Sequence, residues 1–436
     1  MNVKLLTSLI SVFLLCPLIY LLFSVIGLSL DTFVYLWNNL LLGYSLNTLY
    51  LLLLTVFFSL ILGIIPAWFV STTNFRGKSF FDIILFLPLA IPSYIIAFTY
   101  SDLLSYTGPI QSTVRNNYPK FYKYVNHDYL QIEILAFLMA LVLYPYLYTA
   151  CRISFSLLGS NYINISKNLG MSQFQTFFKI ILPISRVSIF SGLFLIIMEV
   201  LNEYGAVKYF GVNTFTSGIF RSWYSMEDIN TASILAVCLL FIVSIFFLLE
   251  RYSTSKYRYN YKPNDKVSGN YSTNKFSRIV IYLICLFPFT LGFFIPVIYI
   301  INNVFKTLNV IDFSELLNLS LNSFFLASVS SLIIVVIAIL FQYIKKISKS
   351  KTVFYLSEIV SLTYALPGAV IAMSLIIFLA FLTKFIGISI AFGSVVILVY
   401  AYVMRYMAVG ISPLRSSFDK HPETFDDTGK NLGMTN

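Results

Sequence analysis

Charged side chains are scarce in this sequence, where Asp, Glu, Lys and Arg together make up 11% of the residues. A soluble domain usually carries about 25% charged residues, so the composition excludes a water-soluble globular protein. Hydrophobic residues make up 58% of the chain, and many apolar runs exceed the roughly 20 residues that cross a bilayer as a helix. The composition therefore indicates an all-α integral membrane protein.

Histidine and cysteine are also scarce, with two and four residues respectively. His127 and His421 both fall in loops, and the cysteines lie in or beside apolar runs without the spacing of a metal site. We interpret the cysteines as small buried hydrophobic residues. We therefore assign no metal ligand and no catalytic residue, and we expect this chain to bind no cofactor.

A complete nucleotide-binding loop is missing as well. Gly77-Lys78-Ser79 resembles the end of a P-loop, but Thr72 stands where that motif requires a glycine. The stretch is also a short basic loop between two apolar runs, whereas a P-loop belongs to a soluble domain. We therefore expect any ATP hydrolysis to take place on a separate subunit.

Acidic residues are fewer than basic residues, 18 against 29, which gives a formal net charge of +11. This excess does not indicate nucleic-acid binding, because membrane proteins gather lysine and arginine in cytoplasmic loops. With a cytoplasmic N-terminus, 22 of the 29 basic residues lie on the inside, and the basic external loop 105–130 is the poorest fit. The charge pattern therefore favours a cytoplasmic N-terminus.

Long apolar runs are the abundant feature, and they predict about ten membrane helices in the chain. The predicted spans are 5–28, 45–71, 80–104, 131–155, 187–204, 231–250, 279–301, 319–343, 354–381 and 389–410. A basic stretch rich in Tyr, Asn and Ser, at 251–278, is interpreted as a cytoplasmic linker, although such a loop can also bind anionic lipid. We therefore divide the chain into a first half at 1–250, this linker and a second half at 279–436.

Three short stretches recur in the same order on both sides of the linker. The first two recur 275 positions apart and the third 263 positions apart: Ser45–Thr48 with Ser320–Ser323, Pro92 with Pro367, and Lys167–Met171 with Lys430–Met434. The difference of 12 residues is accounted for by the external loop 105–130, which is shorter in the second half. Tandem halves of one orientation predict a transporter whose path lies between them.

The second half ends inside the last of these repeated stretches. It has no counterpart to Ile180–Pro183 or to the spans at 187–204 and 231–250. We therefore expect the second half to be C-terminally incomplete.

The first copy of the third repeat lies in a cytoplasmic segment, Asn164–Pro183, which is predicted to form two short helices around a turn. Tyr162–Leu169 forms the first helix, and Gly170 permits a left-handed turn after it. Ser172 is expected to cap the second helix, which runs to Ile181.

Apolar residues in the second of these helices follow the spacing of a single helical face. They are Phe174, Phe177, Phe178 and Ile181, at positions i, i+3, i+4 and i+7. Such a face can bury against a partner protein or rest on lipid. The duplication of the neighbouring stretch favours a partner.

The segment also carries Gly170, Ile180 and Leu182-Pro183 at the spacing of the pattern E-A-A-x3-G-x9-I-x-L-P. It therefore resembles the EAA loop of binding-protein-dependent ABC transporter permeases, with the whole loop at 159–186. The E-A-A positions depart from the pattern: Asn164, Ile165 and Ser166 in the first copy, and Asp427, Thr428 and Gly429 in the second. Only Asp427 keeps the acid.

Longer stretches resemble one branch of this family, the fused two-half permeases for ferric iron. They are Leu87–Val114, Leu201–Leu235 and Val399–Val409. The resemblance implies a type I importer permease in a bacterial plasma (inner) membrane. It also implies a cytoplasmic ABC ATPase dimer that holds ATP and Mg, and an external binding protein that delivers ferric ion.

The resemblance assigns the ATPase-coupling residues as well. They are Asn164, Gly170, Phe174, Phe177, Ile180, Leu182, Pro183, Asp427 and Gly433. Within this class, thiamine or another small solute is an alternative substrate. From a different class, an ion-gradient-driven secondary transporter would explain the repeat but not the duplicated cytoplasmic stretch.

Carboxylates near the end of the span at 187–204 are the candidate residues of the translocation path. Glu199 and Glu203 stand at i and i+4, which predicts a shared helical face, and Asn202 lies beside them. Carboxylates at membrane depth mark a path or a pair, and their oxygens suit a hard cation. The alternative is that Glu203 lies at the external interface and Glu199 pairs with a neighbouring helix.

Overall fold

The computed structural model describes residues 3–27, 30–256, 271–272, 274–348, 350–387 and 394–420. Within this part of the chain, eight helices are long and apolar enough to cross a membrane. Two pairs of helices that meet at a sharp bend also pass this test, so the number is ten if each bent pair is one span. The prediction of an all-α membrane protein is confirmed.

The chain divides into two compact units, which do not coincide with the two halves of the sequence. One unit contains Val34–Glu227 and Phe241–Asn309, and we call it the α8 unit after its central helix. The other contains Met1–Phe33, Asp228–Leu240 and Val310–Asn436, and we call it the α20 unit.

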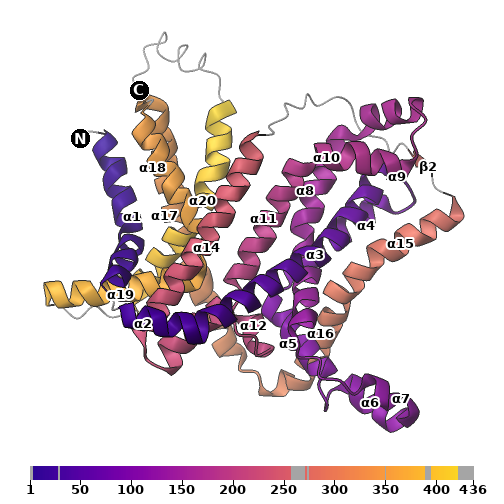
Figure 1. Ribbon diagram of the computed structural model, residues 1–436, viewed down its shortest axis with the longest axis horizontal. Helices are drawn as coiled ribbons and strands as arrows, with labels where there is room; N and C mark the ends of the chain where they lie inside the picture. Colours follow the sequence, from indigo (N-terminus) through magenta and orange to yellow (C-terminus); the bar gives the residue numbers. More distant parts are fainter. Residues whose placement is uncertain are drawn as a thin grey trace. The chain divides into compact units, whose positions relative to one another are not determined.

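The elements from α1 to α14 are formed mainly by the first half of the sequence (Figure 1). They are α1 (Val3–Ile26), α2 (Leu30–Leu36), η1 (Trp37–Leu41), α3 (Leu42–Thr72), β1 (Thr73–Asn74), α4 (Lys78–Ile84), η2 (Leu87–Ala90), α5 (Ser93–Leu104), α6 (Pro109–Asn117), α7 (Pro119–Val125), α8 (Ile132–Asn168), α9 (Gln173–Thr176), η3 (Phe177–Ile181), α10 (Leu182–Ile184), α11 (Arg186–Asn202), α12 (Gly205–Tyr209), α13 (Phe215–Phe220), η4 (Arg221–Ser225) and α14 (Ile229–Lys256).

The remaining elements begin with β2, inside the linker, and continue through the second half. They are β2 (Tyr271–Ser272), α15 (Lys275–Phe289), η5 (Thr290–Phe294), α16 (Ile295–Thr307), η6 (Leu308–Val310), α17 (Phe313–Ser348), α18 (Lys351–Ser361), η7 (Leu362–Ala365), α19 (Gly368–Ile386) and α20 (Val395–Lys420).

The core of the α8 unit forms where α3 and α11 pack against α8. Small residues allow this close approach: a Cβ added at Gly63 of α3 would lie 3.2 Å from the Leu147 Cβ, and one at Gly192 of α11 would lie 2.9 Å from the Leu147 Cα. The large side chains of Tyr144, Tyr148 and Phe155 on α8 are fully buried. The central helix is therefore enclosed along most of its length.

The first helices of the second half also belong to the α8 unit. α15 packs against α3 and α4, and α16 packs against α5. Tyr100 donates a hydrogen bond to the Leu291 carbonyl at 2.7 Å, and Tyr282 donates one to the Arg76 carbonyl at 2.9 Å. Helices from beyond the linker therefore complete this unit.

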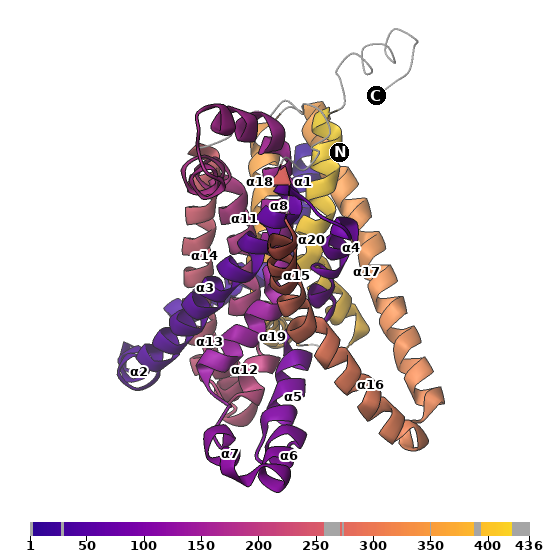
Figure 2. The ribbon, with the colours of Figure 1, turned by 90° about the vertical axis from the view of Figure 1, so that its right-hand side faces the viewer.

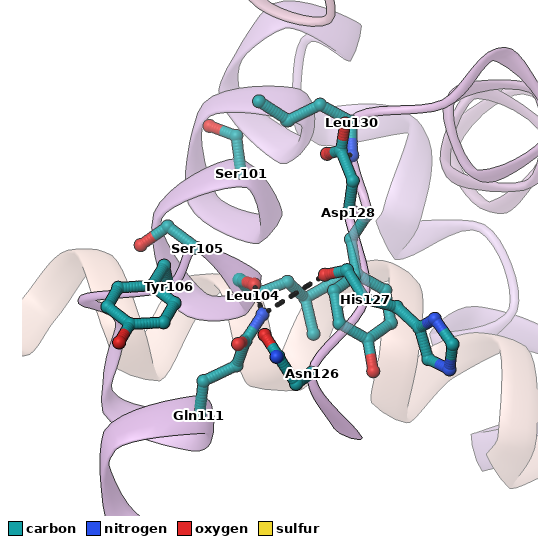
Figure 3. Close-up of a pocket in the computed structure, with 10 residues that line it drawn as sticks. Ser101, Leu104, Ser105, Tyr106, Gln111, Asn126, His127, Asp128 and Leu130 are labelled. Carbon is teal, nitrogen blue, oxygen red and sulfur yellow. Dashed lines mark hydrogen bonds between the residues drawn. The ribbon is translucent and has the colours of Figure 1, made fainter. Parts of the chain in front are cut away.

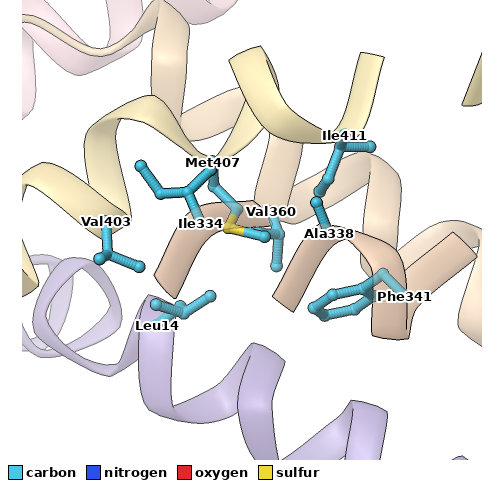
Figure 4. Packing of buried hydrophobic residues seen from close by; sticks show 8 residues of the cluster. All are labelled: Leu14, Ile334, Ala338, Phe341, Val360, Val403, Met407 and Ile411. Carbon is cyan, nitrogen blue, oxygen red and sulfur yellow. The ribbon is translucent and has the colours of Figure 1, made fainter. Parts of the chain in front are cut away.

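The α20 unit shows the converse arrangement, because α1 packs against α17, α18 and α19. Tyr400 donates a hydrogen bond to the Phe13 carbonyl at 2.6 Å. Figure 4 shows the core of this unit, in which eight buried side chains from α1, α17, α18 and α20 meet: Leu14, Ile334, Ala338, Phe341, Val360, Val403, Met407 and Ile411. The first helix of each half thus packs with the remainder of the other half.

The order of elements repeats between the two units. The series α3, α4, η2, α5 and α8 recurs as α17, α18, η7, α19 and α20. Pro92 precedes α5 with φ −58° and ψ 143°, and Pro367 precedes α19 with φ −57° and ψ 142°. The matched prolines therefore adopt one backbone conformation.

The predicted continuous spans at 80–104 and 354–381 are wrong in one respect, because both are broken before these prolines. The pair Lys78–Ala90 and Ser93–Asn117 bends by 86°. Proline lacks an N–H group and pushes the preceding residue out of the helical region, so a helix ends there. An apolar run alone does not reveal such a break.

Candidate functional site

The loop at Asn164–Pro183 begins at the end of α8, which runs without interruption to Asn168. The separate short helix predicted at 162–169 is therefore the last part of a 37-residue helix. Gly170 then turns the chain with φ +71°, as predicted, and its N–H donates to the Lys167 carbonyl at 2.9 Å. A Cβ added at Gly170 would meet nothing within 4 Å, so the backbone conformation alone requires glycine here.

The second part of the loop starts with a capping box, which confirms Ser172 as the cap. The Ser172 hydroxyl oxygen accepts from the Gln175 N–H at 3.2 Å, and the Gln175 side-chain oxygen accepts from the Ser172 N–H at 3.0 Å. α9, the π-helix η3 and α10 follow, and the chain then bends by 71° into α11. The cap and the bend fix the position of this short segment.

The apolar side chains that were predicted to share one face of the second helix in this loop lie on two different faces in the structure. Phe177 lies 5.0 Å from the Trp68 ring, between ring centroids, and Ile181 is fully buried. Phe174 and Phe178 point outward, are 72% and 47% exposed, and have ring centroids 4.5 Å apart. The wider winding of η3 shifts the helical register, so the i+3 and i+4 positions no longer share one face.

The other predicted coupling residues differ in their exposure. Asn164, Gly170 and Pro183 are exposed, whereas Ile180 and Leu182 are half-buried. Leu169 is 71% exposed and adds an apolar side chain to the loop surface. Asp427 and Gly433 lie outside the described residues, as does the second copy of the repeated stretch.

A segment near the end of the linker fixes the base of this loop, which the sequence did not predict. β1 and β2 form a short parallel pair, with Thr73 opposite Tyr271. The Tyr271 ring lies 6.4 Å from the Trp68 ring, between centroids, and the Lys167 ammonium lies 4.5 Å from the Tyr271 centroid. A cation so close to an aromatic face is attracted to it. The loop surface therefore stands on a base made by α3, α8 and β2.

The candidate path residues lie at the end of α11. Glu199 and Asn202 are half-buried on α11, and both interact with neighbouring groups. The prediction that Glu199 and Glu203 share a helical face is wrong, because α11 ends at Asn202 and Glu203 is extended, with ψ 124°. The Glu203 carboxylate instead accepts from the Ala206 N–H at 2.8 Å and caps α12.

The repeated stretch Ser45–Thr48 has a structural role that sequence reasoning missed. The Asn47 side-chain nitrogen donates to the Asn213 carbonyl at 3.1 Å, and the Thr48 hydroxyl oxygen accepts from the Phe215 N–H at 3.2 Å. These bonds tie the segment after α12 to α3. They also hold the region around Glu203, whose carbonyl accepts from the Thr216 hydroxyl at 2.6 Å.

The basic loop 105–130 forms α6 and α7, which lie at the end of the α8 unit opposite to α9 (Figures 1 and 2). A cavity of about 350 Å³ lies beside them, and Ser101, Tyr106, His127 and Asp128 contribute to its lining (Figure 3). The Gln111 side-chain nitrogen donates to the Leu104 carbonyl at 2.8 Å and to the His127 carbonyl at 3.3 Å. Gln111 thus holds the two ends of this loop together.

No cluster of metal ligands occurs in the part of the chain that the structure describes. There, no three His, Cys, Asp or Glu side chains lie close enough to hold a metal ion together. Glu199 and Glu203 therefore belong to no such cluster.

Comparison with known proteins identifies a family for the region that contains this loop. Residues 59–259 match the family model described as "Binding-protein-dependent transport system inner membrane component". The chain is 25% identical to the Fe(3+)-transport system permease protein FbpB 2 of Haemophilus influenzae over 395 residues, which cover 89% of this chain and 72% of that protein.

Permeases named for other solutes match a shorter part. The sulfate transport system permease protein CysT of Escherichia coli is 26% identical over 156 residues, covering 36% of this chain and 54% of that protein. The molybdenum transport system permease protein ModB of Haemophilus influenzae is 28% identical over 159 residues, covering 36% of this chain and 67% of that protein. The level of identity is therefore similar for all three, whereas the coverage differs.

Proposed function

We propose that this chain is the membrane permease of a ferric iron importer. Residues 59–259 belong to the family of inner-membrane components of binding-protein-dependent transport systems. The protein is a multi-pass membrane permease rather than an enzyme. In the proposal, a separate cytoplasmic ABC ATPase dimer binds ATP and Mg and hydrolyses the ATP. An external binding protein delivers the ferric ion.

The loop at Asn164–Pro183 is the observation that carries this proposal. Its outer surface presents Leu169, Phe174 and Phe178, three large apolar side chains that are all at least 47% exposed. Its inner surface is anchored by Phe177 and Ile181 and by the base at Tyr271. A rigid apolar projection of this kind fits a groove on a partner protein, where buried aromatic anchors supply most of the binding energy.

The continuity of α8 suggests how the loop acts on the membrane part. α8 has 37 residues, which at 1.5 Å per residue gives a rod of about 55 Å. A movement of the ATPase dimer at the loop would therefore displace α8 along its whole length. The charge pattern supports a cytoplasmic position for the loop and the N-terminus, because most basic residues then lie inside.

The share of this chain that each relative matches favours ferric iron over sulfate and molybdate as the substrate. The iron permease matches 89% of the chain, including both halves, whereas the sulfate and molybdenum permeases each match 36%. In this proposal, Glu199, Asn202 and Glu203 line the path, since carboxylate and amide oxygens suit a hard cation. Their contacts are weak and transient, and the binding protein supplies the affinity.

Uptake by the assembled transporter tests the substrate. Proteoliposomes that contain this chain, the ATPase subunit and the binding protein should take up radiolabelled ferric iron only when ATP is present. Unlabelled ferric iron should compete, whereas sulfate, molybdate and thiamine should not.

Other outcomes of this assay point to other functions. ATP-driven uptake of sulfate, molybdate or thiamine in place of iron would contradict the proposed substrate and keep the importer class. Uptake that persists without ATP and stops when the ion gradient is collapsed would support a secondary transporter instead.

A further inference from the structure

An ion pair joins two separate helices in the α8 unit. Asp82 on α4 pairs with Arg152 on α8, and these side chains are 25% and 39% exposed. The second oxygen of the Asp82 carboxylate accepts from the Tyr148 hydroxyl at 2.8 Å. Because Tyr148 and Arg152 are one turn apart on α8, the Asp82 carboxylate binds two side chains on the same face of this helix.

The α20 unit contains an ion pair between the corresponding helices. Glu358 on α18 pairs with Arg415 on α20 at 2.6 Å, between a carboxylate oxygen and a guanidinium nitrogen. These side chains are 18% and 28% exposed, so this pair is somewhat more buried than the first.

The two ion pairs occupy matched places in the internal repeat. Arg152 and Arg415 stand 263 positions apart, which is the offset of the repeated KNLGM stretch. Asp82 and Glu358 stand 276 positions apart, one more than the offset of Pro92 and Pro367. The acid has changed type and moved by one position, yet the ion pair between the two helices is present in both units.

A second bond ties the same segments together in each unit. The Tyr144 hydroxyl on α8 donates to the carbonyl of Leu85, just after α4, at 2.8 Å. The Thr363 hydroxyl in η7, just after α18, donates to the Met404 carbonyl on α20 at 2.5 Å. The two bonds use different side chains and run in opposite directions, but each joins the long helix to the segment just after the short helix.

These links connect the helix that carries the loop to the broken segment before α5. α8 leads directly into the loop at Asn164–Pro183, whereas α4 and η2 lead into the break at Pro92 and then into α5. A partly buried ion pair contributes little net stability, because desolvation offsets the attraction. It is directional, however, and it holds one helix to a defined face of another.

We propose that Asp82–Arg152 and Glu358–Arg415 are equivalent latches that make each broken segment follow the long helix beside it during transport. The four side chains are positioning residues in this proposal, which rests on the proposed function. Loss of a latch leaves the ATPase subunit able to dock and hydrolyse ATP, but the long helix then moves without its broken segment.

The test measures substrate taken up per ATP hydrolysed in the reconstituted complex. Asp82→Asn and Glu358→Gln keep the size of each side chain and remove its charge, so we expect normal assembly and about a tenfold loss of uptake per ATP. Glu315→Gln is the matched control, because Glu315 is an exposed carboxylate on α17. Glu315→Gln should take up as much substrate per ATP hydrolysed as the unmodified protein.

A double variant with exchanged charges distinguishes loss of the ion pair from loss of the fold. The double variant Asp82→Arg with Arg152→Asp should recover at least part of the ratio that Asp82→Asn loses, because an ion pair can form again. Unchanged uptake per ATP in both Asp82→Asn and Glu358→Gln would overturn the latch. Absence of ATP-driven uptake in the unmodified complex would overturn the proposed function itself, so the two failures are distinguishable.

Discussion

Gly170 determines how the coupling loop leaves α8. Its φ of +71° lies in the left-handed region, where a side chain other than glycine adds about 1–2 kcal/mol of strain. A side chain there would have open space around it, since a Cβ would meet nothing within 4 Å. The requirement at this position is therefore conformational, and it can be tested separately from packing.

Replacing Gly170 with valine should reduce ATP-driven uptake strongly while leaving the amount of protein in the membrane unchanged. Gly170→Asn should keep most of the uptake, because asparagine adopts the left-handed conformation more readily than a β-branched residue. Gly43→Val is the control, since Gly43 lies in α3 and a Cβ there also meets nothing within 4 Å. Normal uptake by Gly170→Val would show that transport does not depend on the left-handed turn at Gly170.

At the scale of elements, the contact of α11 with α8 shows how small residues set helix packing. The Gly192 backbone approaches Leu147 so closely that an added Cβ would lie 2.9 Å from the Leu147 Cα. Helices in membranes associate through such close contacts, because lipid removes the hydrophobic driving force between them. α11 is also the helix that carries Glu199 and Asn202.

Gly192→Leu should therefore destabilise the protein by about 1–3 kcal/mol through overpacking. The measurement is the thermal unfolding midpoint of the detergent-solubilised chain. Gly43→Leu provides the comparison and should leave the midpoint nearly unchanged, because a Cβ at Gly43 has open space. Equal midpoints for the two variants would contradict the packing of α11 on α8.

The sequence predicted most of the helices but not their breaks or their register. Apolar runs locate helices well, because crossing a bilayer requires about 20 apolar residues. The same runs hide the breaks before Pro92 and Pro367, where hydropathy stays high through the bend. The π-helix at Phe177–Ile181 has no local signal either, and so the outward direction of Phe174 and Phe178 was not predicted.

At the scale of the whole molecule, the units are assembled from both halves of the sequence. α1 packs with the helices of the second half, and α15 and α16 pack with those of the first. No local pattern in the sequence reveals this exchange, because it depends on tertiary contacts such as Tyr400 with Phe13. The sequence did predict the tandem repeat, and the matched elements and ion pairs agree with it.

The proposed function requires the loop at Asn164–Pro183 to dock onto a separate ATPase subunit. The most direct measurement is co-purification of that subunit with the full chain, comparing the unmodified protein with Phe174→Ser and Phe178→Ser. Each substitution should weaken the association by at least about 1 kcal/mol, because each removes an exposed aromatic anchor. Phe121→Ser is the matched control, since Phe121 is 63% exposed on α7 at the opposite end of the same unit. We expect Phe174→Ser and Phe178→Ser to lose the ATPase subunit while Phe121→Ser retains it. Equal retention of the ATPase subunit in all three variants would show that it does not dock at this loop.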